Sequence, residues 1–261
     1  MRFFASISYN GTGFSGWQSQ LNAIGIQDEV QRALSTVLGK KTSVTGAGRT
    51  DAEVNASMFT AHFDSDDTHI LKEHDRIVYK INAILPKNIV INRIYRVRDD
   101  AHARFDAVSR TYRYYIHRGK DPFAWQFSWM CKFPLDMEAM NKGAGYLTGR
   151  KDFSCFEKAG GSSGSSICDV THAIWSPYTP SPVAVPDTEY MVFTITANRF
   201  LRNMVRAVVG SLVEIGRGKR QPEWILDILL SGDRSSAGQS VPGHALFLSD
   251  IGYPDSITDF Q

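Results

Sequence analysis

Cysteines and long apolar runs are scarce in this sequence. The 261 residues include three cysteines, at positions 131, 155 and 168, and no Cys-x-x-Cys pair. An odd, sparse set of this kind predicts reduced thiols rather than a disulfide framework or a zinc site. No run approaches the roughly 18 apolar residues of a membrane span, and the N-terminus has no signal-peptide pattern. We therefore expect a soluble cytoplasmic protein without a metal site or a membrane anchor.

The motifs of common cofactor-dependent enzymes are missing as well. The sequence has no P-loop, no GxSxG, no HExxH and no GxGxxG fingerprint. Hydrophobic residues make up 43% and charged residues 21% of the chain, which is typical of a globular protein with a hydrophobic core. Chemistry driven by a bound cofactor therefore has no support in the sequence.

The net charge is only +2, but the basic residues are unevenly distributed. Between Arg93 and Arg118, seven arginines stand against three acidic residues. Between Arg199 and Arg220, six basic residues stand against Glu214 alone. Such stripes fit a phosphate-binding face, although ordinary solvated faces of helices and strands have the same composition.

Hydrophobic periodicity divides the chain into strands and helices. In the first part it predicts strands at 2–9, 44–47, 58–63 and 89–97, and helices at 27–38 and 69–85. Further along it predicts strands at 111–118, 168–175, 190–196 and 246–251, and helices at 136–147, 200–215 and 222–230. Two loops are expected to be mobile, at 160–166 and 177–186. The similar element order suggests two related α/β lobes that share one sheet, residues 1–104 and residues 105–261.

A glycine-containing loop between two short strands offers the clearest candidate chemistry. Residues 46–52 are Gly-Ala-Gly-Arg-Thr-Asp-Ala, and the glycines permit close approach of a ligand. Asp51 supplies a carboxylate, and Arg49 supplies a planar cation that can stack or pair. On residue type and spacing alone, the simpler interpretation is that Thr50 and Asp51 stabilise a turn.

Six groups of motifs follow one another along nearly the whole chain. They are Tyr9–Gln18; Gly48-Arg49-Thr50-Asp51-Ala52; Ala103-Arg104-Phe105 with Arg110-Thr111-Tyr112-Arg113-Tyr114; Asp152–Phe156; Asn198–Arg206; and Leu246-Phe247-Leu248 with Tyr253-Pro254. Together they resemble the tRNA pseudouridine synthases that modify the anticodon stem-loop, called the TruA family in bacteria. The chain departs from the family after Ala52, where Glu-Val-Asn-Ala stands instead of the usual Gly-Val-His-Ala. A left-handed backbone at Glu53 would cost of order 1 kcal/mol.

The resemblance implies a fold and a reaction. The fold would be α+β, with two RRM-like lobes sharing a mostly antiparallel central sheet flanked by helices. The reaction would convert uridine to pseudouridine without a cofactor, on the 3′ side of the anticodon loop and in its stem (tRNA positions 38–40). The resemblance also implies a homodimer that binds one tRNA across both subunits.

Roles for individual residues follow from the same resemblance. Asp51 would be the catalytic carboxylate, attacking C1′ or taking a proton from C2′. Arg206 would be its cationic partner, and Tyr112 would stack on the uracil and accept the C5 proton. Arg49 would fill the space left by the extruded base.

Further arginines are expected to bind RNA phosphates. Arg199, Arg202 and Arg206 stand at i, i+3 and i+7 of the expected helix 200–215, so they would form one basic face. Arg110 belongs to the other basic stripe and would bind the substrate with them. From the residues alone, Tyr112 also fits a plain core position, because Tyr112, Tyr114 and Ile116 alternate on one strand.

Two other functions remain open. The first is a non-catalytic RNA-binding protein with RRM-like lobes, in which Asp51 is only a loop residue. The second is an enzyme that uses an aspartate nucleophile on a small metabolite and turns over without RNA. Loss of pseudouridine with retained tRNA binding in an Asp51→Ala variant would separate the synthase from both.

Overall fold

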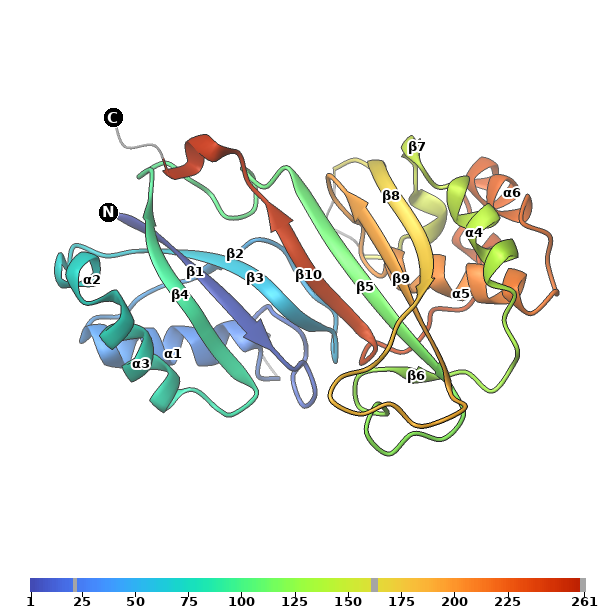
Figure 1. The fold of residues 1–261 in the computed structure, drawn as a ribbon. Helices are drawn as coiled ribbons and strands as arrows, with labels where there is room; N and C mark the ends of the chain where they lie inside the picture. Colours follow the sequence, from blue (N-terminus) through green and yellow to red (C-terminus); the bar gives the residue numbers. More distant parts are fainter. Residues whose placement is uncertain (21–22, 161–163, 259–261) are drawn as a thin grey trace. The chain divides into compact units, whose positions relative to one another are not determined.

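The structure is a computed structural model that describes residues 1–20, 23–160 and 164–258. It has the mixed α/β architecture that the sequence predicted, with mostly antiparallel strands flanked by helices (Figure 1). The chain divides into two compact units. Unit 1 comprises Met1–Ser109 and Leu248–Gln261, and unit 2 comprises Arg110–Phe247. The periodicity suggested a division at 104/105 and placed the last strand in the second lobe, because it carries no information on which lobe a terminal strand joins.

Unit 1 is built around β1 (Arg2–Tyr9), which pairs antiparallel with β3 (Asn55–Asp64) on one side and β4 (Ile89–Val97) on the other. The short β2 (Thr45–Gly46) pairs with β3. Helix α1 (Ile26–Leu38) contacts α3 (His74–Ile84), and α3 packs on β4. The bounds of β1 and β4 match the predicted ranges, and Gly39 ends α1 in a left-handed conformation that favours glycine.

The predicted helix at 69–85 is wrong in one respect. The structure has two helices there, α2 (His69–Lys72) and α3, separated by Glu73. Glu73 has φ −121° and ψ 29°, which is not helical, although its N–H still donates to the carbonyl of His69. No glycine or proline marks this break, so the sequence pattern gave no sign of it.

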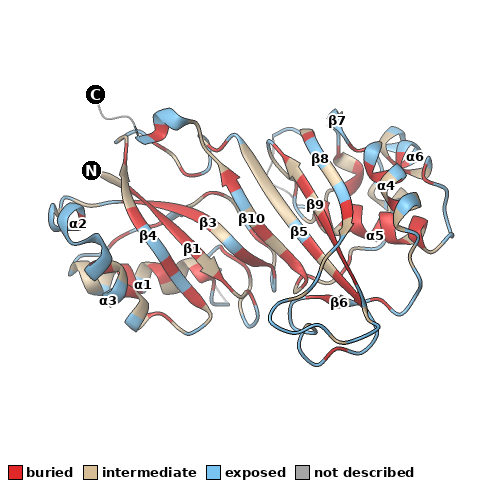
Figure 2. Cartoon of the chain, viewed as in Figure 1, coloured by how far each residue is buried: buried red, intermediate tan, exposed pale blue. Residues whose placement is uncertain are grey.

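The sheet of unit 2 contains four antiparallel strands in the order β5 (Ser109–Arg118), β9 (Glu189–Ala197), β8 (Ile167–Pro177) and β7 (Gly149–Asp152). A short β6 (Trp129–Met130) runs parallel to β5. Helix α4 (Met137–Gly145) packs against β8 and against α5 (Met204–Gly216), and α6 (Trp224–Ser231) lies beside α4. Eleven of the 13 residues of α5 are buried, and Figure 2 shows it as the central helix of this core. The last strand, β10 (Leu246–Gly252), precedes the C-terminal turn η3 (Asp255–Thr258).

Helix α5 begins four residues later than the sequence predicted. Asn203 precedes it with φ 64°, a left-handed conformation that stops the helix from extending backward. Arg199 and Arg202 therefore lie before the helix, and the proposed i, i+3, i+7 basic face is wrong. The apolar face is confirmed, because Val205, Val208, Val209 and Leu212 are all buried.

Other sequence expectations have mixed outcomes. The three cysteines are free thiols, as expected, and all are buried. Residues 178–188, which join β8 to β9, form an irregular segment that overlaps the predicted loop at 177–186. The Tyr190 hydroxyl holds this segment by accepting a hydrogen bond from the Val185 N–H at 2.9 Å. The predicted mobile loop at 160–166 includes residues 161–163, which lie outside the described residues. In the described ranges, none of the helices has the length and apolar character to span a bilayer.

Candidate active site

Asp51 lies on a turn immediately before β3 in unit 1. The Val54 N–H donates to the carbonyl of Asp51 at 3.2 Å, closing the turn. Within it, Glu53 has φ 65°, so the left-handed backbone that the sequence analysis considered is present. Asp51 is half-buried, Thr50 is buried and Arg49 is exposed. Asp51 and Arg49 therefore lie on the same short turn, which Thr50 joins to the interior of unit 1.

The first sequence motif, Tyr9–Gln18, holds this turn in place. The Tyr9 and Thr50 hydroxyls are hydrogen-bonded at 2.9 Å, and the Trp17 N–H donates to the Thr50 carbonyl at 3.3 Å. A Cβ at Gly16 would lie 2.1 Å from the Thr50 carbonyl oxygen, and Gly16 has φ +99°. Only glycine fits that approach and that conformation. The two motifs therefore form one structural unit.

A second contact fixes the other end of the turn. The side-chain oxygen of Asn55, which is 1% exposed, accepts a hydrogen bond from the Gly11 N–H at 2.8 Å. A Cβ at Gly11 would lie 2.3 Å from the Val54 carbonyl oxygen, so the two backbones are pressed together. Asn55, where the family usually has histidine, thus pins the strand entry that follows Asp51.

Aromatic packing supports the same unit from beneath. The rings of Trp17 and Phe59 lie 4.1 Å apart, and Tyr9 packs edge-on against Phe59 at 5.7 Å. A Cβ at Gly46 would lie 2.4 Å from the indole nitrogen of Trp17, so this glycine permits the close packing of β2 on the indole. Buried aromatic contacts of this kind resist displacement. Asp51 is therefore mounted on a rigid part of unit 1.

In unit 2, Tyr112 lies on β5 opposite Ile195 of β9. It is half-buried and meets Phe200 edge-to-face at 5.1 Å. Tyr114 and Ile116, on the same face of the strand, are 0% and 1% exposed. The core interpretation therefore holds for these two residues, whereas Tyr112 keeps part of its ring accessible.

Arg206 is in the first turn of α5 and is clamped by a loop that crosses the helix. Its Nε donates to the Val241 carbonyl at 2.7 Å, and the Val241 N–H donates back to the Arg206 carbonyl at 3.2 Å. A Cβ at Gly210 would lie 1.8 Å from the Gln239 carbonyl oxygen, so glycine lets this loop lie directly on α5. These contacts fix the plane of the guanidinium.

The other predicted binding arginines gather around the connection from β9 to α5. Arg110 donates to the Asn198 carbonyl at 2.8 Å, and Arg202 donates to the Ala159 carbonyl at 3.3 Å. Burial raises the pKa of the Cys168 thiol to about 11, and the positive charge of nearby Arg199 partly opposes this increase. The sequence placed Arg199 and Arg202 on a helix, but the structure places them on the irregular segment before α5; Arg110 lies on β5.

Much of the two basic stripes is neutralised by ion pairs. Arg217 and Lys219 both pair with Glu214, at 3.0 and 3.3 Å. Arg98 pairs with Asp100 at 3.5 Å and Arg118 with Glu189 at 3.1 Å. For these residues, the ordinary interpretation of a solvated surface is the better one. Among the described residues, no group of three or more His, Cys, Asp or Glu side chains is arranged to hold a metal ion.

Sequence reasoning missed the residues that mount the candidate site. Tyr9, Trp17 and Asn55 act through contacts with residues about 33 to 44 positions away, which periodicity does not reveal. The glycines at 11 and 16 were the available signal, because the close backbone contacts here depend on them.

Comparison with known proteins identifies the class of this chain. The profile of a family described as tRNA pseudouridine synthase matches residues 144–254. A protein named tRNA pseudouridine synthase A from Bacteroides fragilis is 44% identical over 257 residues, which are 98% of each chain. Proteins of the same name from Porphyromonas gingivalis and Colwellia psychrerythraea are 44% and 34% identical, again over 98% of this chain and over 98% and 95% of their own length.

The fold and these similarities define a pseudouridine synthase, an enzyme of the isomerase class, as the sequence predicted. The chain belongs to the tRNA pseudouridine synthase A family.

Proposed function

We propose that this enzyme converts uridines of the tRNA anticodon stem-loop to pseudouridine, with Asp51 as the catalytic carboxylate. The observation that carries the proposal is the rigid mount of Asp51, built from the two N-terminal motifs. A reacting group must be held close to its productive geometry, since a displacement of about 1 Å can cost 100-fold in rate. The targets we propose are uridines on the 3′ side of the anticodon loop and in its stem.

The reaction is an internal rearrangement of one nucleotide. The bond between ribose C1′ and uracil N1 breaks, the base rotates, and a bond forms between C1′ and C5. The proton on C5 is lost and N1 gains one, so atoms and charge balance without an oxidant or a cofactor. Asp51 either attacks C1′ or removes a proton from C2′, and both roles use an ionised carboxylate.

The proposal gives roles to several further side chains. Tyr112, with its partly accessible ring, would stack on the uracil and accept the C5 proton. Arg206, held by Val241, would pair with the Asp51 carboxylate and keep it ionised. Arg49, exposed on the Asp51 turn, would occupy the stack that the extruded uridine leaves. Arg110, Arg199 and Arg202 would bind phosphates, which makes tRNA binding weaken steeply with salt.

The decisive experiment compares Asp51→Asn with Asp66→Asn. Asp66 is also in unit 1 but is solvated, with its side chain 90% exposed and paired only loosely with Lys40 at 3.4 Å. We expect Asp51→Asn to bind tRNA but to form no pseudouridine, while Asp66→Asn retains full activity when the anticodon arm is mapped. Pseudouridine at wild-type levels in Asp51→Asn would refute the assignment. Binding by the wild type without any product would favour the non-catalytic alternative.

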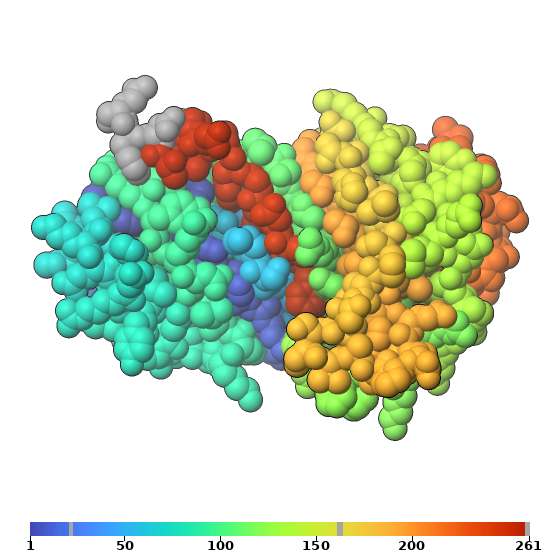
Figure 3. Space-filling model, viewed as in Figure 1, coloured from blue at the N-terminus to red at the C-terminus, as the bar shows by residue number. Residues whose placement is uncertain are grey.

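A homodimer is part of the same proposal, and an exposed aromatic segment of unit 2 supports it. Phe123, Trp125 and Phe127 are 62%, 60% and 39% exposed. The segment is ordered, because buried Asp121 accepts the Phe123 N–H at 2.7 Å and the Tyr190 hydroxyl at 2.6 Å. Figure 3 shows this part of the chain (green) beside the segment 178–188 (orange) at the lower edge of unit 2. Aromatic side chains exposed on an ordered segment are typical of protein interfaces.

Sedimentation of a Trp125→Lys variant tests this interface. We expect a dimer for the wild type and a monomer for the variant. Leu230→Lys on α6 is the control, because Leu230 is 86% exposed but stands apart from the aromatic segment in sequence. A dimer that persists in Trp125→Lys would remove this segment from the interface.

The proposed place of action is the cytoplasm, where tRNA is processed.

A further inference from the structure

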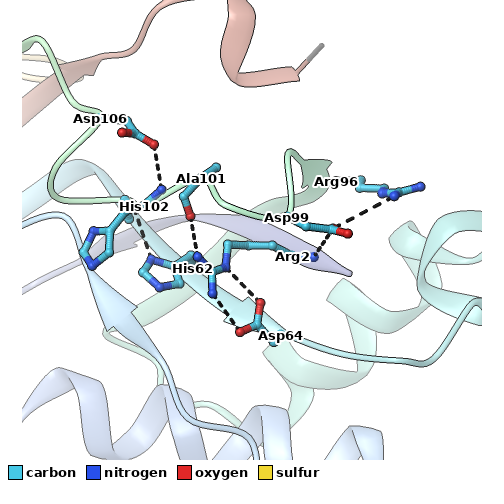
Figure 4. A network of polar contacts seen from close by, with 9 residues as sticks. Arg2, His62, Asp64, Arg96, Asp99, Ala101, His102 and Asp106 are labelled. Carbon is cyan, nitrogen blue, oxygen red and sulfur yellow. Dashed lines mark hydrogen bonds and ion pairs between the residues drawn. The ribbon is translucent and has the colours of Figure 1, made fainter. Parts of the chain in front are cut away.

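The loop between β4 and β5 carries the Ala103-Arg104-Phe105 motif, which the proposed chemistry does not use. Its backbone is tied at successive residues. The Ala103 N–H donates to Nδ1 of His62 at 3.1 Å, and the His102 N–H donates to Asp106 at 2.7 Å (Figure 4). Nδ1 of His102 accepts from the N–H groups of Arg104 and Phe105, at 3.1 and 3.3 Å. The tip of this loop therefore has a fixed conformation.

The network beneath the tip anchors it to the sheet of unit 1. His62, on β3, is 7% exposed, and its ring meets that of His102 edge-on at 4.7 Å. Arg2 forms a two-pronged pair with Asp64, with both N–O distances 2.9 Å, and also donates to the Ala101 carbonyl at 2.9 Å (Figure 4). The loop thus rests on the buried His62 of β3 and on the ion pair between Arg2 of β1 and Asp64 of β3.

This rigid loop presents two side chains to solvent. Phe105 is 74% exposed, and Arg104 is also exposed with its guanidinium carbon 5.7 Å from the Phe105 ring. Ala103 between them and the sheet is fully buried. An aromatic ring beside a cation, held outward by an ordered backbone, has the chemistry that binds single-stranded nucleic acid: the ring stacks on a base and the cation meets the backbone.

We propose that Arg104 and Phe105 form a second contact with tRNA, in which Phe105 stacks on an unpaired base and Arg104 binds a neighbouring phosphate. This rests on the proposed function, which makes tRNA the substrate. We place this contact away from the reacting uridine, because the loop rests on His62 near the far end of β3. His62 is seven residues along β3 from Asn55, next to the Asp51 turn, which corresponds to about 23 Å.

The charge of the loop favours RNA over a second copy of this chain. A two-fold contact centred on this loop would set each Arg104 close to its symmetry mate, which like charges oppose. The phosphate backbone instead offers a negative charge to each arginine. A single exposed ring of this kind also gives little area for a protein interface.

The test uses Phe105→Leu, which keeps an apolar side chain but removes the ring. Tyr79→Leu is the matched control, because Tyr79 is 75% exposed on α3 of the same unit and belongs to none of these contacts. We expect Phe105→Leu to raise KM for full-length tRNA roughly tenfold with kcat unchanged, since a contact away from the reacting centre contributes equally to ground state and transition state. Tyr79→Leu should leave both constants unchanged. Phe105→Trp should restore KM, and its added indole fluorescence should be quenched by tRNA.

Two outcomes would overturn the contact. One is a wild-type KM for Phe105→Leu together with no tRNA-dependent change in the fluorescence of Phe105→Trp. The other is a change of oligomeric state in Phe105→Leu, which would make a second copy the occupant. The Asp51→Asn variant keeps the two proposals distinguishable: if it is inactive while Phe105→Leu behaves as wild type, only the second contact fails.

Discussion

Replacing Gly16 with alanine tests whether the mount of Asp51 matters for catalysis. The new Cβ would lie 2.1 Å from the Thr50 carbonyl oxygen, well inside any tolerated contact, and the residue keeps φ +99°. Strain of that backbone conformation costs about 1–3 kcal/mol, and relief of the clash by shifting neighbours costs about 1–3 kcal/mol more. Because Thr50 directly precedes Asp51, the shift would displace the carboxylate by a substantial fraction of an ångström. We expect kcat for pseudouridine formation to fall about 100-fold.

Gly13→Ala is the control for this prediction. Gly13 lies in the same segment with φ +85°, but a Cβ there would meet nothing within 4 Å. It therefore carries a similar backbone strain without the contact to Thr50. Both variants should lose stability in thermal unfolding, and only Gly16→Ala should lose most of its turnover with tRNA. If the two variants retain the same kcat, the contact between Gly16 and Thr50 does not position Asp51, and the reasoning fails.

Three further predictions concern unit 1. Glu53→Gly should stabilise the protein by about 1 kcal/mol, seen as a higher midpoint of thermal unfolding, because glycine removes the cost of the left-handed backbone. An unchanged or lower midpoint would contradict this. Burial and the charge of Arg2 lower the pKa of His62 from 6.5 to about 4, so the unfolded chain binds the proton more readily. The contribution of neutral His62 to the free energy of unfolding should therefore be fully present above pH 6.5. This free energy should fall by at most about 3 kcal/mol as the pH drops to 4. His62→Gln should weaken the dependence of the unfolding free energy on pH, measured by denaturation at several pH values. A pH dependence identical to that of the wild type would contradict this explanation. Asn55→Ala should destabilise by about 1–3 kcal/mol in urea unfolding, because it leaves the Gly11 N–H without its acceptor; loss of less than about 0.5 kcal/mol would show that water replaces the bond.

Local pattern predicted the regular elements where the pattern is strong. The apolar pattern gave the bounds of β1 and β4, since β1 is rich in apolar residues and buried throughout residues 3–7, and apolar residues recur at buried positions along β4. The pattern failed for β6 and β7, which have two and four residues and are too short to show a period. It also failed at the start of α5, where the left-handed Asn203 interrupts a run of residues that individually suit a helix.

The candidate site divides in the same way. Asp51 and Arg49 were selected because Gly48–Ala52 resembles a family motif, whereas residue type and spacing alone favoured a simple turn. The surroundings of Asp51 could not be, because the bond between Tyr9 and Thr50 joins residues 41 positions apart. The clamp of Arg206 by Val241 spans 35 positions and depends on a loop that has no regular structure. Such contacts are set by the tertiary fold, so only the glycines that permit close approach hint at them in advance.

The two departures from the family pattern have different physical consequences. Glu53 adopts the left-handed conformation that suits the usual glycine, so the chain keeps the shape of the turn and accepts a strain of about 1 kcal/mol. Asn55 instead gains a specific contact, because its buried amide oxygen satisfies the Gly11 N–H. That bond joins the Asp51 turn to the segment that also holds Thr50. The backbone strain at Glu53 lowers the stability of this turn, whereas the hydrogen bond of Asn55 raises it. In this chain the turn that carries Asp51 is therefore held by the Asn55 contact despite the backbone strain at Glu53.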